Sequence, residues 1–112
     1  MIEQVEIWQQ KFREIAPLIQ KAEYEVVKCE ADVKKLQARL ELMATARGVK
    51  TVSAQKTYAD NDDNLYEARL SVGVAKGKLS ALKIELKALD VGFDEWRTKM
   101  VNAREEKKRY GA

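Results

Sequence analysis

The chain has 112 residues, with 21 basic and 18 acidic side chains, a formal charge of +3 and no histidine. Its 35% charged and 46% apolar residues are typical of long helices and coiled coils. Without histidine, and with Cys29 as its one cysteine, the chain cannot build a zinc site, a Ser-His or Cys-His nucleophile pair, or an internal disulfide. We therefore expect no enzyme, no metal, no cofactor and no small-molecule substrate.

Apolar runs in this chain are short. None approaches the roughly 18–20 residues that span a bilayer, so we expect no membrane partner. Residues 1–16 carry charges among their apolar positions, which is unlike a signal peptide. Together with the lone cysteine, which suits a reducing compartment, this predicts a cytoplasmic location.

The first half of the chain carries a stripe of apolar residues at alternating steps of three and four. The stripe consists of Val5, Trp8, Phe12, Ile15, Ile19, Ala22, Val26, Cys29, Val33, Leu36, Leu40 and Met43. This heptad spacing predicts a long helix over about residues 2–47 that ends before Gly48, a favourable C-terminal cap. Pro17 lies away from the stripe and predicts either a kink or a separate N-terminal helix. Because the stripe keeps its register, we favour the kink.

Residues 48–60 form a linker. Ser53 is expected to cap a short helical turn over about residues 54–60. Ser53 and Lys56 also match a Ser-x-x-Lys catalytic pattern, but its companion motifs are missing, so we prefer the capping role. The acidic run over residues 60–64 is expected to cap the next helix.

A second heptad stripe occupies the other half. It consists of Leu65, Ala68, Val72, Ala75, Leu79, Leu82, Leu86, Leu89, Phe93, Trp96, Met100 and Ala103, and it predicts a helix over about residues 61–108. Two such helices joined by a short linker are expected to fold back as a long antiparallel hairpin, one all-α domain over residues 1–112. Charge favours this pairing, since residues 33–56 carry six basic and one acidic residue, while residues 57–75 carry one basic and four acidic. Exchange of the pairing between two chains would satisfy the same stripes.

The opposite face of the second helix carries another apolar stripe, which a lone hairpin does not need. We call it the outer stripe, and it consists of Leu70, Val74, Gly77, Ala81, Ile84, Ala88 and Val91. Exposed stripes of this kind mark interfaces. We therefore expect homo-oligomerisation into a helical bundle or ring, with these residues at the oligomer interface; docking onto a foreign helix is the alternative.

Basic residues gather at the end of the first stripe and in the linker, where Tyr58 follows a cluster of Lys34, Lys35, Arg39, Arg47, Lys50 and Lys56. They predict a surface for single-stranded nucleic acid, because cations track phosphates and rings stack on bases. The predicted nucleic-acid-binding residues are Lys35, Arg39, Arg47, Lys50, Lys56 and Tyr58. Intramolecular pairing with the acidic helix, or a merely solvated charged face, is the competing interpretation.

The segment from residue 30 to residue 48 resembles the basic helical element of the UvsY family, the recombination mediators of T-even and related phages. The matching residues are Glu30-Ala31, Leu36-Gln37-Ala38-Arg39-Leu40-Glu41 and Arg47-Gly48. Trp8, early in a first long helix, also fits the family layout. The chain departs from the family at Gln37, where the family has lysine, and at Leu42-Met43, where it has aromatic residues.

This resemblance implies a ring-forming helical oligomer that binds single-stranded DNA, in the host cytoplasm if the chain is phage-encoded. Such proteins load a recombinase onto strands covered by single-strand-binding protein, so both proteins become expected partners. Arg39 is implied to contact phosphate by its match to the motif. The alternative, from another class, is a coiled-coil interaction module, such as a small phage inhibitor or assembly protein that docks on a host or virion protein.

Overall fold

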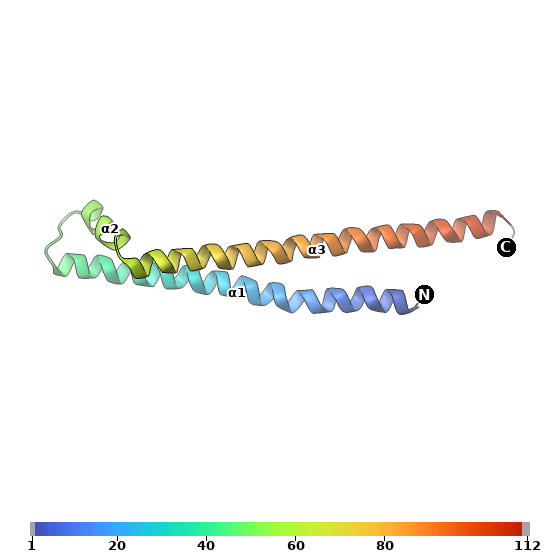
Figure 1. The fold of residues 1–112 in the computed structure, drawn as a ribbon, viewed down its shortest axis with the longest axis horizontal. Coiled ribbons are helices and arrows are strands. Elements are labelled where there is room, and N and C mark those ends of the chain that lie inside the picture. Colours follow the sequence, from blue (N-terminus) through green and yellow to red (C-terminus); the bar gives the residue numbers. More distant parts are fainter. Residues whose placement is uncertain (1, 111–112) are drawn as a thin grey trace. The chain divides into compact units, whose positions relative to one another are not determined.

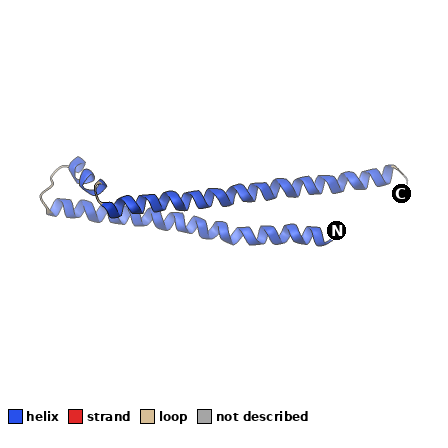
Figure 2. Ribbon diagram, viewed as in Figure 1, coloured by secondary structure: helices blue, strands red, loops and turns tan. Residues whose placement is uncertain are grey.

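The computed structural model describes residues 2–110 of the chain. Across these residues it has three α-helices: α1 (Ile2–Ala46), α2 (Val52–Asp60) and α3 (Asp63–Arg109) (Figure 1). No strand occurs in this described range, and turns connect the helices (Figure 2). The all-α prediction is confirmed, and the two long helices begin and end within two residues of their expected bounds.

Contacts divide the chain into two compact units. The central unit is Gln20–Ser80, and the terminal unit combines Met1–Ile19 with Ala81–Ala112. Both units contain a part of α1 and a part of α3, and the central unit also contains α2. The two units are described separately below.

In the central unit α1 and α3 pair in the antiparallel sense. Leu40 of α1 clusters with Leu65 at the start of α3 and with Ala59 of α2, and all three side chains are at most 5% exposed. Further along, Glu30 of α1 reaches Lys76 of α3. The heptad stripes therefore form the contact, as their spacing predicts.

One stripe position in the central unit differs from the expectation. Met43 is 40% exposed, whereas its neighbour Ala44 is completely buried. The next buried residue of α1 after Leu40 is therefore four positions further along the chain, whereas the stripe predicted a step of three. The reason is that a third segment, the turn and α2, closes over this end of the helix pair, and the small alanines Ala44 and Ala59 occupy its most enclosed positions.

Local hydrogen bonds define the ends of the helices. Gly48 has φ of +89°, and its N–H donates to Thr45 O while Val49 N–H donates to Ala44 O. This is a Schellman cap, and it confirms the predicted helix end because glycine adopts positive φ without a Cβ penalty. The turn is further held by Gln55, whose Nε2 donates to Val49 O at 3.0 Å.

The expected cap of the short helix was wrong by two residues. α2 begins at Val52, and Thr51 Oγ1 accepts the N–H of Ala54 at 3.1 Å, so Thr51 and not Ser53 is the N-cap. Thr51 has the extended backbone that an N-cap needs, whereas Ser53 already lies inside the helix. The acidic run caps α3 as predicted, because Asp62 Oδ1 accepts the N–H groups of Asn64 and Leu65.

The terminal unit is held by aromatic side chains. Phe93 of α3 makes edge-on contacts with Trp8 and Phe12 of α1, with ring centroids 6.0 and 6.1 Å apart. Trp96 lies beside Phe93 at 5.9 Å. Gly92 leaves room for the Trp8 ring, since a Cβ there would lie 2.9 Å from Trp8 Cη2. Both helices therefore pack through their predicted stripes here as well.

Pro17 does not end the first helix. α1 continues from Ile2 to Ala46 with Pro17 inside it, so the alternative of a separate N-terminal helix is wrong. Pro17 is exposed, whereas Ile15 of the stripe is buried, which confirms that the proline lies away from the packed face.

Candidate nucleic-acid interface

The predicted basic residues lie on the C-terminal part of α1, the following turn and α2, all in the central unit. We call Lys35, Arg39, Arg47, Lys50 and Lys56 the basic segment. Each of these five side chains is exposed. Lys35 and Arg39 lie one helical turn apart on α1, Arg47 and Lys50 lie in the turn, and Lys56 lies on α2. The fold therefore leaves the whole basic segment accessible.

Within the described residues the basic segment makes no ion pair, since no carboxylate oxygen lies within 4.0 Å of any of its charged nitrogens. Two of the acidic residues expected to neutralise it are used otherwise, since Asp60 binds Arg69 at 2.8 Å and Asp62 caps α3. Close pairing within the described chain therefore does not account for these charges, whereas a solvated charged face, the other competing interpretation, agrees with their exposure.

Tyr58, the predicted stacking residue, is half-buried on α2. The guanidinium carbon of Arg47 lies 5.7 Å from the centroid of the Tyr58 ring, which is cation–π distance. Arg47 thus covers one face of the ring, and a base could stack on that face only if Arg47 moved. The structure brings Arg47 and Tyr58 together, while Lys35 and Arg39 lie on α1.

A second basic feature of the central unit escaped the sequence prediction. It is a groove of about 440 Å³ between α1 and α3, lined by Glu30, Val33, Lys34, Gln37, Arg69, Val72 and Lys76. We call it the basic groove. Its three cations come from both helices, and the five residues of the basic segment do not line it.

Ion pairs hold two of the three groove cations, but only loosely. Lys76 contacts Glu30 at 3.4 Å and Arg69 contacts Asp60, with the four side chains between 43% and 61% exposed. Exposed pairs of this kind contribute about 0–1 kcal/mol. A phosphate can therefore replace either carboxylate at small cost, and Lys34 is exposed as well.

The basic groove could have been found from the two stripes. Arg69 and Lys76 each follow a d position of the second stripe, namely Ala68 and Ala75, whereas Lys34 follows Val33, an a position of the first stripe. A residue directly after a d position flanks the seam of a coiled coil and faces the partner helix. The sequence does not give the register of the pairing between the two helices. In addition, Arg69 lies in a segment whose net charge is negative, so charge counts alone do not indicate a basic site there.

The outer stripe of α3 is exposed in both units. In the central unit Leu70 and Val74 are 49% and 58% exposed, and in the terminal unit Ile84 and Val91 are 70% and 50% exposed. Gly77, Ala81 and Ala88 are exposed too. No helix of the described chain covers these residues, which is the condition for the predicted oligomer interface.

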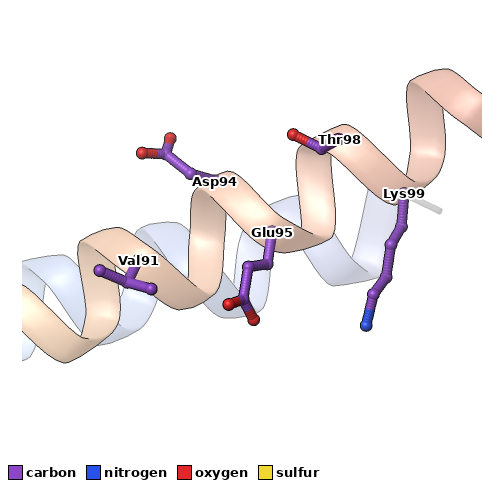
Figure 3. Close-up of a pocket in the computed structure, with 5 residues that line it drawn as sticks. All are labelled: Val91, Asp94, Glu95, Thr98 and Lys99. Carbon is purple, nitrogen blue, oxygen red and sulfur yellow. The ribbon is translucent and has the colours of Figure 1, made fainter.

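A shallow hollow surrounds Val91 at the end of the outer stripe. Figure 3 shows that Asp94 and Glu95, which line it, project to different sides of α3. Two diverging carboxylates do not form a paired acid–base or metal-binding group. Among the residues that the structure describes, no group of three or more cysteine or acidic side chains is placed to hold a metal ion.

None of the helices in the described range is long and apolar enough to cross a membrane. Comparison of the chain with protein-family models, with curated proteins and with solved structures found no match.

Proposed function

We propose that the chain is a single-stranded-DNA-binding accessory protein of phage-type homologous recombination, acting in the cytoplasm as a recombination mediator. The observation that carries this proposal is the exposed basic segment, whose five cations lack carboxylate partners among the described residues. Cations left free by their own fold gain most from phosphate, since binding releases the counterions condensed on the strand.

The shape of the basic surface suits a flexible single strand. The basic segment follows α1, a turn and α2, which is an irregular path and not one straight helix face. A single strand can bend to follow such a path, whereas a duplex is stiff. The basic groove adds three cations in the same unit, so a strand has two neighbouring tracks.

Self-association completes the proposed mechanism. One copy offers only a few phosphate contacts, but linked copies raise the effective concentration of the next site and so raise avidity. The exposed outer stripe supports assembly into a helical bundle or ring. By the resemblance to the UvsY family, the assembled protein would hold the strand while a recombinase replaces single-strand-binding protein on it.

Fluorescence anisotropy with a labelled oligonucleotide tests the DNA contact. We expect binding at about 50 mM salt and an about 100-fold weaker affinity at about 200 mM, if five phosphates are contacted. The double variant Arg39→Ala/Lys50→Ala should weaken binding and flatten the salt dependence, because two of these contacts are lost.

The matched control is Lys83→Ala/Lys87→Ala, which removes the same charge from exposed positions of α3 outside both basic features. This control should bind nearly as well as the parent chain. Equal losses in the two double variants would mean that net charge and not the basic segment drives binding. An absence of binding at about 50 mM salt would rule out the proposed function.

The second candidate function is a coiled-coil interaction module, such as a phage inhibitor or assembly protein. It is favoured by Ile84, the most exposed large aliphatic residue of the outer stripe, because such a side chain on a helix surface suits contact with a foreign helix. Light scattering and a gel shift separate the two candidates. A chain that stays monomeric and does not bind DNA supports the coiled-coil interaction module.

A further inference from the structure

The terminal unit contains a groove that the proposed DNA contact does not use. It measures about 370 Å³, and its lining includes Val5 of α1 and Trp96, Arg97, Met100, Val101 and Arg104 of α3. We call it the arginine groove. Its floor is apolar, with Val5 38% and Val101 50% exposed, and two arginines also line it, of which Arg97 makes an exposed ion pair with Asp94 at 3.5 Å. An occupant should therefore combine an apolar side chain with carboxylates.

The aromatic rings at this groove are already engaged. Phe93, which also lines it, contacts three other rings, and the Arg97 guanidinium lies 5.7 Å from its centroid. A nucleic-acid base would need a free ring face to stack on. The exposed hydrophobic side chains of the groove, Val5 and Val101, are aliphatic, which suits a side chain such as isoleucine or leucine.

The same unit carries a surface of complementary chemistry on α1. Glu3, Glu6, Ile7, Gln10, Lys11 and Glu14 share one exposed face, and we call it the acidic patch. Ile7 is 46% exposed among three carboxylates and one ammonium group. Lys11 lies over the Trp8 ring at 4.9 Å, and Gln10 donates a hydrogen bond to Glu14.

The spacing of charges agrees between the two surfaces. Arg97 and Arg104 are seven residues apart on one helix, and Glu6 and Glu14 are eight apart on another. At 1.5 Å per residue these separations are about 10 Å and about 12 Å along the helix axis. Val101 lies four residues after Arg97, and Ile7 lies one residue after Glu6, so each span of charges contains an aliphatic side chain.

We propose that the acidic patch of one copy docks in the arginine groove of a second copy, with Ile7 on the apolar floor and Glu6 and Glu14 at the two arginines. This inference deepens the proposed function, since it rests on self-association and names two surfaces, apart from the outer stripe, that produce it. It makes no use of the basic segment.

The contact is head-to-tail. Val5 lines the groove and Ile7 belongs to the patch, and two residues along a helix correspond to about 200° around its axis. The two surfaces therefore face opposite ways on α1, so a single two-fold dimer cannot use both at once. Contacts of this kind continue from copy to copy and close into a ring or extend as a filament.

Sedimentation velocity of the full chain without DNA tests the proposal. The groove variant Arg97→Glu/Arg104→Glu and the patch variant Glu6→Lys/Glu14→Lys should each associate at least about tenfold more weakly than the parent chain, because like charges then face each other. All four side chains are exposed, so both variants should keep their helical circular dichroism. The control Lys83→Glu/Lys87→Glu changes charge as much as the groove variant does and should assemble normally.

Mixing the two variants gives the decisive result. The groove variant keeps an intact acidic patch and the patch variant keeps an intact arginine groove, and the two reversed surfaces are complementary to each other, so the mixture should assemble although neither variant does so alone. A single chain carrying all four substitutions should assemble again, since both charges are reversed.

Three results would overturn the proposal: a parent chain that stays monomeric up to about 200 µM, variants that assemble like the parent, or a mixture that associates no more strongly than the separate variants. In the second case Ile84→Lys would show whether the outer stripe drives assembly instead. Anisotropy of the same variants with oligonucleotide keeps the two proposals apart. If the parent chain assembles but does not bind DNA, only the proposed function is contradicted. If assembly depends on residues outside the arginine groove and the acidic patch, only this inference is contradicted.

Discussion

The central and terminal units both bury the apolar faces of α1 and α3, but with different numbers of helical segments. In the central unit three segments meet, and Leu40, Ala44, Ala59, Leu65 and Ala75 are buried. In the terminal unit only two helices meet, and Ile15 is the one buried hydrophobic residue described there. Two helices cover each other along one strip, whereas a third segment closes the side that would otherwise face water.

The terminal unit compensates with large rings. The four rings are all half-buried, and Phe93 contacts each of the other three, which are Trp8, Phe12 and Trp96. Aromatic side chains bury a large area even when one edge stays in water, and edge-on pairs add about 0.5–1.5 kcal/mol beyond that area. The same incompleteness leaves the arginine groove open. A unit that cannot cover its apolar surface alone is thus the natural place for a second copy to bind.

The largest expected effect is the loss of the most enclosed side chain. Leu65→Ala should lower the free energy of unfolding by about 2–5 kcal/mol, because Leu65 is fully buried among three segments. Leu86→Ala, at a half-buried stripe position of the terminal unit, should cost about 1–2 kcal/mol. Urea unfolding followed by circular dichroism measures both, and equal losses would contradict the difference between the units.

Two glycine substitutions distinguish the units, because the expected changes in stability have opposite signs. Gly92→Ala should lower stability by about 1–2 kcal/mol, since its Cβ would meet the Trp8 ring. Gly73→Ala meets nothing within 4 Å and should raise stability by up to about 1 kcal/mol through helix propensity. Thermal unfolding measures the stability of both variants. Trp8→Phe removes the Cη2 atom that the new Cβ would meet, so it should reduce the loss of stability caused by Gly92→Ala. No relief would mean that the close approach does not matter.

The smallest expected effect concerns the cap that distinguishes the central unit. Thr51→Ala should lower the free energy of unfolding by about 1 kcal/mol, because the N–H of Ala54 loses its acceptor. Ser53→Ala should change it by less than about 0.5 kcal/mol. Urea unfolding of the two variants side by side decides which residue is the cap, and a larger loss at Ser53 would refute the assignment.

Much of the fold was predictable, because heptad spacing is a local property of the chain. The bounds of α1 and α3, the cap at Gly48 and the acidic cap of α3 all follow from residues within a few positions of each other. The cap of α2 was misplaced because Thr51 and Ser53 are both good N-caps, and only the backbone conformation chooses between them. Exposure of the basic segment also followed from its positions outside the stripe.

Periodicity and composition establish that this chain forms long helices, where their apolar faces lie and that its cations cluster near the middle. The packing of the helices establishes which residues share a groove, namely Lys34 with Arg69 and Lys76, and Val5 with Trp96 and Met100. The reason is physical. Periodicity within a helix depends on neighbours three or four residues away, whereas a groove depends on the register between helices that are far apart in the chain, and that register is set by the packing of side chains across the pair.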